Sequence, residues 1–168
     1  MFIHTIGYGN SDLDGLIARS KPFNIDHFVD VRTNAYSRYQ PDFRDPEFSK
    51  NLKISGYKYT FMGDLIGGKP DWEEVQVAGK VEGELLIKDP RFLRGLELIQ
   101  NQIAKGAQNM ALLCGCGDPM SCHRGRWIGP ELLTKGIESV HILTDGSTLT
   151  QSQARSAVYR QSSLFAMD

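Results

Sequence analysis

The segment "ALLCGCGDPMSCHRGR" (111–126) changes character halfway along its length. It starts inside an apolar run, "NMALLCG" (109–115), which has the length and composition of a buried strand. It ends in a basic stretch, where a helix is expected to start near Ser121. A buried strand that leads through a polar loop into a helix is the repeating unit of α/β proteins, so this segment indicates the fold class.

Four other apolar runs, separated by helix-like segments, repeat this pattern. They are "MFIHTIGYG" (1–9), "HFVDVR" (27–32), "YKYTFMG" (57–63) and "SVHILT" (139–144). Strands that alternate with helices predict a parallel sheet covered on both faces. We therefore expect an α/β fold with three layers, in which a mainly parallel five-stranded sheet is flanked by helices in a Rossmann-like arrangement.

Acidic residues and prolines mark the expected helix starts. Asp45-Pro46 and Asp89-Pro90 each place a capping acid before a proline, which is favoured at the first helical position because its missing N–H costs nothing there. Asn10 or Ser11 is expected to cap the first helix. Pro130 lies inside the last expected helix and predicts a kink.

The length of 168 residues and the hydrophobic content of 40% fit one globular domain. We place this domain at residues 1–145 and a polar C-terminal tail at 146–168. The net charge of −1 argues against a long basic face that tracks duplex DNA, so any contact with nucleic acid would be local.

The cysteines and the apolar runs bear on the compartment. All three cysteines lie in one short stretch, unlike the paired framework of small secreted proteins. There is no charged-then-apolar leader, and no apolar run approaches the roughly 20 residues needed to span a bilayer. We expect a cytoplasmic protein that does not enter a membrane.

Polar residues gather where the expected strands end, which is where open parallel sheets bind ligands. The glycines of "GYGN" (7–10) would let the backbone approach an anion, and "DVRTNAYSR" (30–38) supplies planar guanidinium groups and an acid–base candidate, Asp30. A plain tight turn and a buried Asp30–Arg32 pair are the structural alternatives. The ligand-binding residues expected here are Gly7, Tyr8, Gly9, Asn10, Arg32, Ser37 and Arg38.

The loop that carries the cysteines is compatible with several kinds of site. A zinc site formed by Cys114, Cys116, Cys122 and His123 would have an unfamiliar spacing and two adjacent ligands, so we expect no metal. The cofactor is otherwise unknown. A phosphatase-type loop is excluded because no arginine follows any of the cysteines at the required spacing.

Two interpretations of the helix start remain beside a purely structural role. Backbone N–H groups, Ser121 and Arg124 could hold a phosphate group. Alternatively, Cys122 is a reactive thiol activated by His123, by Arg124 and by the helix start. The catalytic candidates are accordingly Cys122, His123 and Asp30.

Taken together, these motifs resemble the DUF488 family, a domain of unknown function. The corresponding pieces are "TIGYGN" (5–10), "DVRTNAYSR" (30–38), "LIGG" (65–68) and "LLCGCGDPMSCHR" (112–124). The chain departs from the family pattern at Tyr8, where histidine is usual, at Ala35, where proline is common, and at Cys116-Gly117, which replaces an acidic position. The resemblance implies an α/β fold with its polar motifs at one site. Members are often labelled as related to DNA repair.

The segment "QSSLF" (161–165) is similar to the pentapeptide with which bacterial replication and repair proteins dock on the sliding clamp. In such a segment Leu164 and Phe165 would fill an apolar pocket while Gln161 makes polar contacts. The alternative is that both apolar side chains pack against the domain.

Three functions follow from these observations. The first is binding of, or catalysis on, a phosphate-bearing ligand, either a nucleotide or a nucleic acid, with a link to DNA repair. The second is a non-catalytic DNA-associated accessory protein recruited through the clamp-binding segment. The third is a thiol or metal redox protein. The sequence leaves open whether the protein is an enzyme and whether it forms oligomers.

Overall fold

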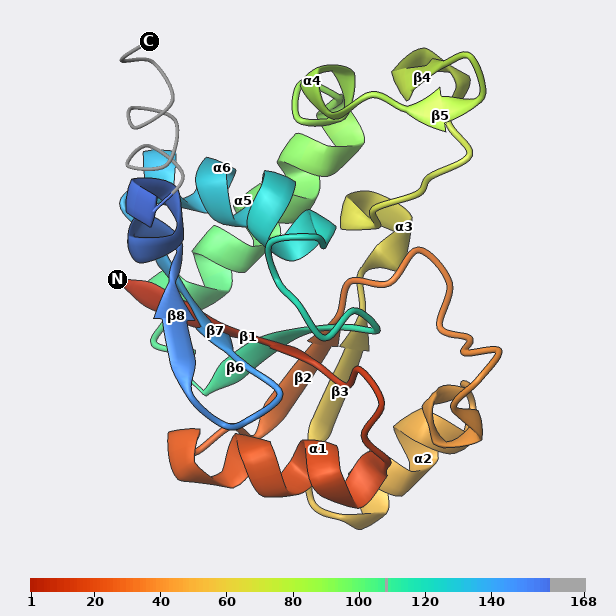
Figure 1. Ribbon diagram of the computed structural model, residues 1–168, viewed down its shortest axis with the longest axis vertical. Coiled ribbons are helices and arrows are strands. Elements are labelled where there is room, and N and C mark those ends of the chain that lie inside the picture. The colour runs from red at the N-terminus through yellow and green to blue at the C-terminus, as the bar shows by residue number, and fades with distance from the viewer. Residues whose placement is uncertain (108, 158–168) are drawn as a thin grey trace, which may run out of the picture.

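The computed structural model describes residues 1–107 and 109–157, and a six-stranded sheet forms its centre (Figure 1). In spatial order the strands are β3 (Lys58–Phe61), β2 (His27–Asp30), β6 (Met110–Cys114), β1 (Phe2–Gly7), β7 (Glu138–Ile142) and β8 (Thr148–Thr150). The first five pair in parallel, and β8 adds an antiparallel edge. The α/β prediction is confirmed, with six strands in this sheet instead of five.

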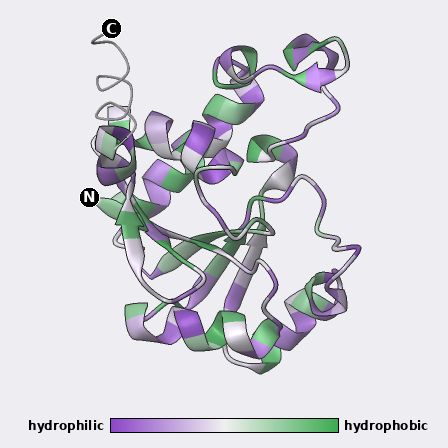
Figure 2. Cartoon of the chain, in the orientation of Figure 1, coloured by the Kyte–Doolittle hydropathy of each residue, from purple (hydrophilic) through white to green (hydrophobic). Residues whose placement is uncertain are grey.

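The two central strands are the most buried part of the sheet. All five residues of β6 are buried, as are five of the six in β1. A parallel strand covered on both faces needs apolar side chains on each of them, which explains the continuous apolar runs in the sequence. In the hydropathy colouring β6 is largely green, whereas the surrounding helices alternate between green and purple (Figure 2).

Helices cover both faces of the sheet. One core cluster joins α3 (Gly63–Ile66), α5 (Pro90–Ala104) and α6 (Gly129–Thr134) to residues such as Ile3 of β1 and Leu112 of β6. A second cluster joins α1 (Leu13–Ser20) and α2 (Glu47–Ile54) to Ile6 and Leu113 of the same strands. The alternation along each strand therefore produces the three predicted layers.

The remaining elements are short and lie in the connections. The 3-10 turns are η1 (Lys21–Phe23), η2 (Pro41–Phe43) and η3 (Glu73–Val75). A small hairpin of β4 (Gln76–Val77) and β5 (Lys80–Val81) precedes α4 (Gly83–Leu86), and a π-helical turn, η4 (Arg124–Ile128), precedes α6. Among the described residues, no helix combines the length and the apolar character required to cross a bilayer.

The helix starts agree with the sequence in part. Asp89 caps α5 by accepting a hydrogen bond from the backbone N–H of Arg91, as predicted. The cap of α1 is Asp12, which accepts from Gly15, in place of the expected Asn10 or Ser11. Pro130 lies in the first turn of α6, which directly follows π-helical η4, and its missing N–H is tolerated at a helix start; the predicted kink stays a prediction.

The segment after residue 145 contributes to the fold as far as the structure describes it. β8 pairs with β7, and residues 151–157 form a helix. Gln151 is buried and bonds to the ring of His141 and to the carbonyl of Gly125. The predicted clamp-binding residues Gln161, Leu164 and Phe165 lie outside the described residues.

Candidate functional site

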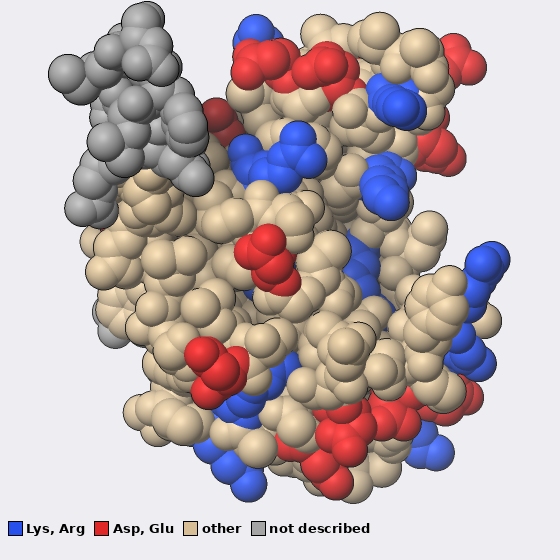
Figure 3. All heavy atoms as spheres, viewed as in Figure 1, with Lys and Arg blue, Asp and Glu red and all other residues tan. Residues whose placement is uncertain are grey.

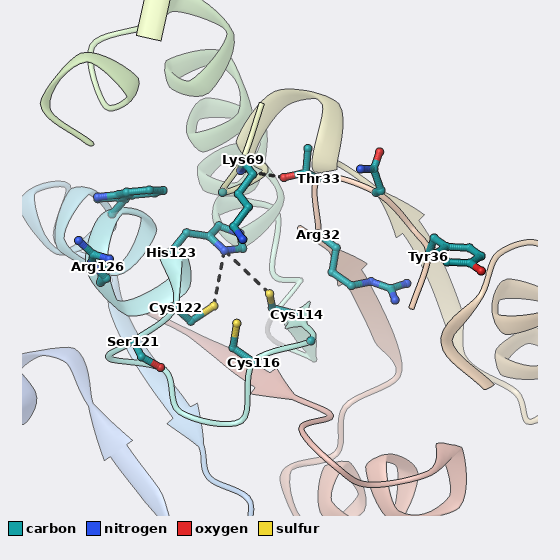
Figure 4. A pocket seen from close by; sticks show the side chains of 14 residues that line it. Arg32, Thr33, Tyr36, Lys69, Cys114, Cys116, Ser121, Cys122, His123 and Arg126 are labelled. Atoms are coloured by element: carbon teal, nitrogen blue, oxygen red, sulfur yellow. Dashed lines mark hydrogen bonds between the residues drawn. The ribbon is translucent and has the colours of Figure 1, made fainter. Parts of the chain in front are cut away.

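A cavity of about 390 Å³ lies at the carboxyl ends of β2 and β6, the edge of the sheet where the sequence places its polar motifs (Figure 4). Three segments that are far apart in the chain form its walls: the loop after β2, the loop after α3, and the segment from the end of β6 into η4. Its lining consists of Arg32, Thr33, Asn34, Tyr36, Gly68, Lys69, Cys114, Gly115, Cys116, Ser121, Cys122, His123, Arg126 and Trp127.

The three cysteines meet on one side of this cavity. Cys114 ends β6, Cys116 lies in the loop that follows, and Cys122 precedes η4, yet their three Sγ atoms all lie within 4.8 Å of one another. Cys114 and Cys122 are buried, whereas Cys116 is exposed. The expectation that the protein has no metal site is therefore wrong: a spacing that is unfamiliar in sequence still brings three thiol ligands together, because the loop turns back on itself.

His123 lies against this thiol cluster. Its Nδ1 atom is 3.5 Å from Sγ of Cys122 and 3.9 Å from Sγ of Cys114. Its Nε2 atom is 2.9 Å from the carbonyl oxygen of Val31, at the end of β2. A carbonyl only accepts hydrogen bonds, so Nε2 carries a proton and Nδ1 faces the sulfur atoms.

The thiols and the imidazole of the cluster shift one another's pKa values. Hydrogen bonds with Cys114 and Cys116 lower the pKa of Cys122 far below its ordinary value, and His123 and Arg124 act in the same direction against burial. Hydrogen bonds with Cys114 and Cys122 raise the pKa of Cys116. Burial lowers the pKa of His123, but its hydrogen bonds to Cys114 and Cys122 outweigh burial and raise it to about 10. Negative charge is thus favoured at Cys122 and positive charge at His123.

Arg124 is completely buried behind the cluster. It donates to Oγ1 of Thr5 on β1 at 3.0 Å and to the carbonyl oxygen of Cys116 at 2.7 Å. The ion pairs of the described residues do not include Arg124, and its Nε atom has no hydrogen-bond partner. The guanidinium therefore fixes the loop that carries Cys116 and supplies a buried positive charge next to the thiols.

Asp30 and Arg32 form a buried ion pair beside the cavity. Oδ2 of Asp30 is 2.6 Å from a terminal nitrogen of Arg32 and accepts from the hydroxyl of Tyr59 at 2.9 Å, while Oδ1 accepts from the backbone N–H and from Nε of Arg32. Burial opposes the charge of Arg32, but Asp30 outweighs this effect and raises the pKa of Arg32. Burial, and then the charge of Asp30, raises the pKa of Tyr59.

Arg32 is also held on its other side. It donates to the carbonyl oxygen of Phe43 at 2.7 Å, and its guanidinium lies over the rings of Tyr8 and Phe48. The ring of Tyr8 in turn stacks on Phe43, with 3.8 Å between ring centroids. Figure 4 shows the guanidinium directed away from the thiols. Arg32 lines the cavity while most of its donors are occupied by the protein; the ligand-binding role of Arg32 and the catalytic role of Asp30 stay predictions.

The other residues predicted from the sequence lie at different distances from the cavity. In "GYGN", the backbone of Gly7 lies against the loop that carries Cys116 and not against a ligand site, since a Cβ atom on Gly7 would lie 1.8 Å from the carbonyl oxygen of Cys116. Asn10 and Arg38 are exposed, and Ser37 is buried and accepts from the backbone of Gln40; none of these three lines the cavity.

The helix start that was expected to hold an anion is occupied by a carboxylate of the chain. Asp118 accepts hydrogen bonds from the backbone N–H groups of Met120 and Ser121, and the hydroxyl of Ser121 donates to the carbonyl of Asp118. The N–H of Cys122 donates to Pro119. Ser121 still lines the cavity, but the backbone donors around it already have partners.

Sequence reasoning missed Lys69, Arg126, Tyr36 and Trp127, which all line the cavity. Lys69 directly follows the glycine pair of "LIGG", and Arg126 follows Cys122 by one helical turn, a spacing that places both on one helix face. The glycine pair was the sequence signal for Lys69, and the four-residue spacing from Cys122 was the signal for Arg126.

Comparisons with known proteins agree with the resemblance noted in the sequence. The family model described as "Domain of unknown function DUF488" matches residues 12–127, which is more than half of the chain. The comparisons with curated proteins and with solved structures gave no match.

Proposed function

The chain belongs to the DUF488 family, and from its site we propose that this protein binds a phosphate-bearing ligand of the nucleotide class in the strand-end cavity. One observation carries the proposal. The lining brings two unpaired positive side chains, Lys69 and Arg126, and no aspartate or glutamate among the described residues; the other two nitrogen bases are already engaged, Arg32 with Asp30 and His123 with the thiols. A cavity with this lining favours an anion over a cation or a neutral ligand.

Lys69 and Arg126 are the two charges available to such a ligand. Both are exposed, and neither takes part in the ion pairs of the described residues. The backbone N–H of Lys69 donates to Oγ1 of Thr33 at 2.8 Å, which fixes the loop that carries it. Figure 3 shows lysine and arginine atoms in and above the recess on the right of the molecule. A phosphate group held by both side chains would make charge-assisted hydrogen bonds.

The rest of the lining suits the other parts of a nucleotide. Tyr36 and Trp127 offer aromatic surfaces, and Asn34 and Ser121 offer hydrogen-bonding groups. Aromatic side chains accept any base by stacking, whereas amide and hydroxyl groups select among bases or contact the sugar. The cavity volume of about 390 Å³ lies within the usual range for small-molecule sites.

The finer functional predictions from the sequence remain separate from this proposal. The link to DNA repair stays a prediction. So does the docking of Gln161, Leu164 and Phe165 on a sliding clamp, because these residues lie outside the described part of the chain. Binding of a nucleotide is compatible with either an enzyme or an accessory protein.

Isothermal titration of adenosine monophosphate into the full chain tests the proposal. Loss of a hydrogen bond to a charged group costs about 1.5–3 kcal/mol, so Lys69→Ala and Arg126→Ala should each weaken binding by roughly 10- to 150-fold. Lys135→Ala is the matched control, because Lys135 is an exposed lysine at the end of α6 and does not line the cavity. Equal affinities for all three variants and the wild type, or equal affinity for adenosine without its phosphate, would refute the proposal.

A further inference from the structure

We infer that Cys114, Cys116, Cys122 and His123 form a tetrahedral zinc site that builds one wall of the strand-end cavity. The inference goes beyond nucleotide binding and does not rest on it. The starting point is that every cysteine of the chain is in this cluster, and that the three Sγ atoms lie within 4.8 Å of one another. Around a zinc ion with Zn–S bonds of about 2.3 Å, tetrahedral geometry requires sulfur atoms about 3.8 Å apart. A small contraction of the cluster is therefore sufficient.

His123 is the proposed fourth donor: it lies next to two of the three thiols, and it and Cys116 would have to move closer together to share one ion. Its Nδ1 atom lies 3.5 Å from Sγ of Cys122 and 3.9 Å from Sγ of Cys114. In a tetrahedral site with one imidazole, the nitrogen and each sulfur are about 3.5 Å apart. Figure 4 shows the imidazole above the sulfur atoms, with both contacts directed at the same ring nitrogen. The two adjacent residues Cys122 and His123 can therefore share one ion.

The orientation of the imidazole is fixed from outside the cluster. Nε2 of His123 bonds to the carbonyl oxygen of Val31 at 2.9 Å, and metal-binding histidines typically make such a bond with the nitrogen that does not bind the metal. The backbone of Gly68 covers the ring so closely that a Cβ atom there would lie 2.7 Å from Cγ of His123. The histidine is thus preorganised by two segments that are remote in sequence.

The buried charge behind the cluster supports a negatively charged centre. A zinc ion with three thiolates and a neutral imidazole has a net charge of −1. Arg124 is fully buried, belongs to no ion pair of the described residues, and bonds to the carbonyl of Cys116. A buried guanidinium normally requires an anionic partner, and the zinc–thiolate centre would provide it.

The donor set selects the metal. Thiolates are soft ligands that favour zinc over magnesium or calcium, and four nitrogen and sulfur donors in a tetrahedron are typical of zinc. Four protein ligands leave no open position, which is the arrangement of structural zinc sites. The ion would cross-link the loop 115–123 to the end of β6. It would thereby stabilise the cavity wall that includes Ser121 and Arg126.

Cobalt substitution in the full chain tests this site. Zinc content is measured by mass spectrometry after purification under reducing conditions, and chelator-treated protein is then titrated with Co²⁺. We expect one metal ion per chain, the visible bands of tetrahedral cobalt, thiolate-to-cobalt charge-transfer absorption, and displacement of cobalt by zinc. Cys116→Ser is the first variant, since its side chain is exposed and the fold should tolerate it. Its charge-transfer absorption should fall by about one third, because one of three thiolates is lost.

His123→Asn should leave the thiolate absorption in place but weaken cobalt binding by at least about 10- to 100-fold, the loss usually seen even for an outer partner of a metal ligand. His27→Asn is the matched control, because His27 bonds to Thr60 away from the cavity. A wild-type protein without the tetrahedral thiolate spectrum, or a Cys116→Ser spectrum equal to that of the wild type, would overturn the inference. Lys69→Ala should not alter the spectrum, so failure of nucleotide binding is distinguishable from failure of the zinc site.

Discussion

The imidazole of His123 donates from Nε2 to the carbonyl oxygen of Val31 at 2.9 Å, across 92 positions of sequence. This bond joins the segment after β6 to the end of β2 and turns Nδ1 toward the thiols of Cys114 and Cys122. The same contact therefore shapes the cavity and presents a nitrogen donor to the cysteine cluster. The chemistry of this site depends on two adjacent parallel strands that end at the same edge of the sheet.

Tyr36 should affect the binding of a base but not of phosphate alone. Its side chain is 61% exposed and lines the cavity, where it can stack on a base. Stacking contributes about 1–3 kcal/mol per base, so Tyr36→Ala should weaken binding of adenosine monophosphate by roughly 5- to 150-fold and leave inorganic phosphate unaffected. Tyr39, which is 85% exposed and does not line the cavity, provides the control Tyr39→Ala. Titration calorimetry on both variants checks this, and equal losses in the two would contradict it.

Asp30→Asn should destabilise the fold. The carboxylate is fully buried and neutralises Arg32, which is itself only 6% exposed, so the substitution leaves an uncompensated buried charge. Breaking such a pair costs about 3–5 kcal/mol in the free energy of unfolding. The control is Glu97→Gln, which removes an exposed pair with Arg94 and should cost less than about 1 kcal/mol. Urea unfolding measures both; a small loss for Asp30→Asn would mean that the pair is not needed to hold the loop after β2.

His141 should make stability depend on pH. Burial lowers its pKa from the ordinary value of 6.5, and the charge of Arg124 adds to this effect, against the hydrogen bond to Gln151. The folded protein thus favours neutral His141, whose ring contacts Oγ1 of Thr5 at 2.8 Å and Gln151 at 2.9 Å. A proton binds to His141 more readily in the unfolded chain. The contribution of neutral His141 to the free energy of unfolding is therefore complete above the ordinary pKa and is lost as pH falls through the lowered pKa of the folded protein.

Urea unfolding between about pH 8 and pH 5 measures this dependence. The free energy of unfolding should decrease toward acid pH in the wild type, and less steeply in His141→Gln, which has no group that titrates in this range. An unchanged slope in the variant would assign the pH dependence to other groups.

The centre of the sheet was predictable because its central strands are buried on both faces. The run "NMALLCG" (109–115) has a continuous apolar core, and such runs are typical of parallel strands with helices on each side. β8 was missed because it consists of only three residues, "TLT", at the edge of the sheet, where polar residues are tolerated. Asp12 was missed as a cap because three adjacent residues could each have capped α1.

The sequence indicated where the cavity lies but not all of the residues that line it. Strand ends gather polar motifs, which located the cavity, but local spacing does not reveal how a loop folds back. The zinc interpretation was set aside because the spacing is unfamiliar and two of the ligands are adjacent, although the loop brings the sulfur of Cys116 to those of Cys114 and Cys122. Lys69 reaches the cavity from a distant loop, and only the tertiary fold brings it there.

The most direct test of nucleotide binding is a crystal structure of the full chain grown with adenosine monophosphate. We predict electron density for the phosphate within hydrogen-bonding distance of Nζ of Lys69 and of the guanidinium of Arg126, with the base beside Tyr36 or Trp127. Ligand density outside this cavity, or a cavity that stays empty at a concentration where the protein binds the nucleotide in solution, would contradict the proposed function.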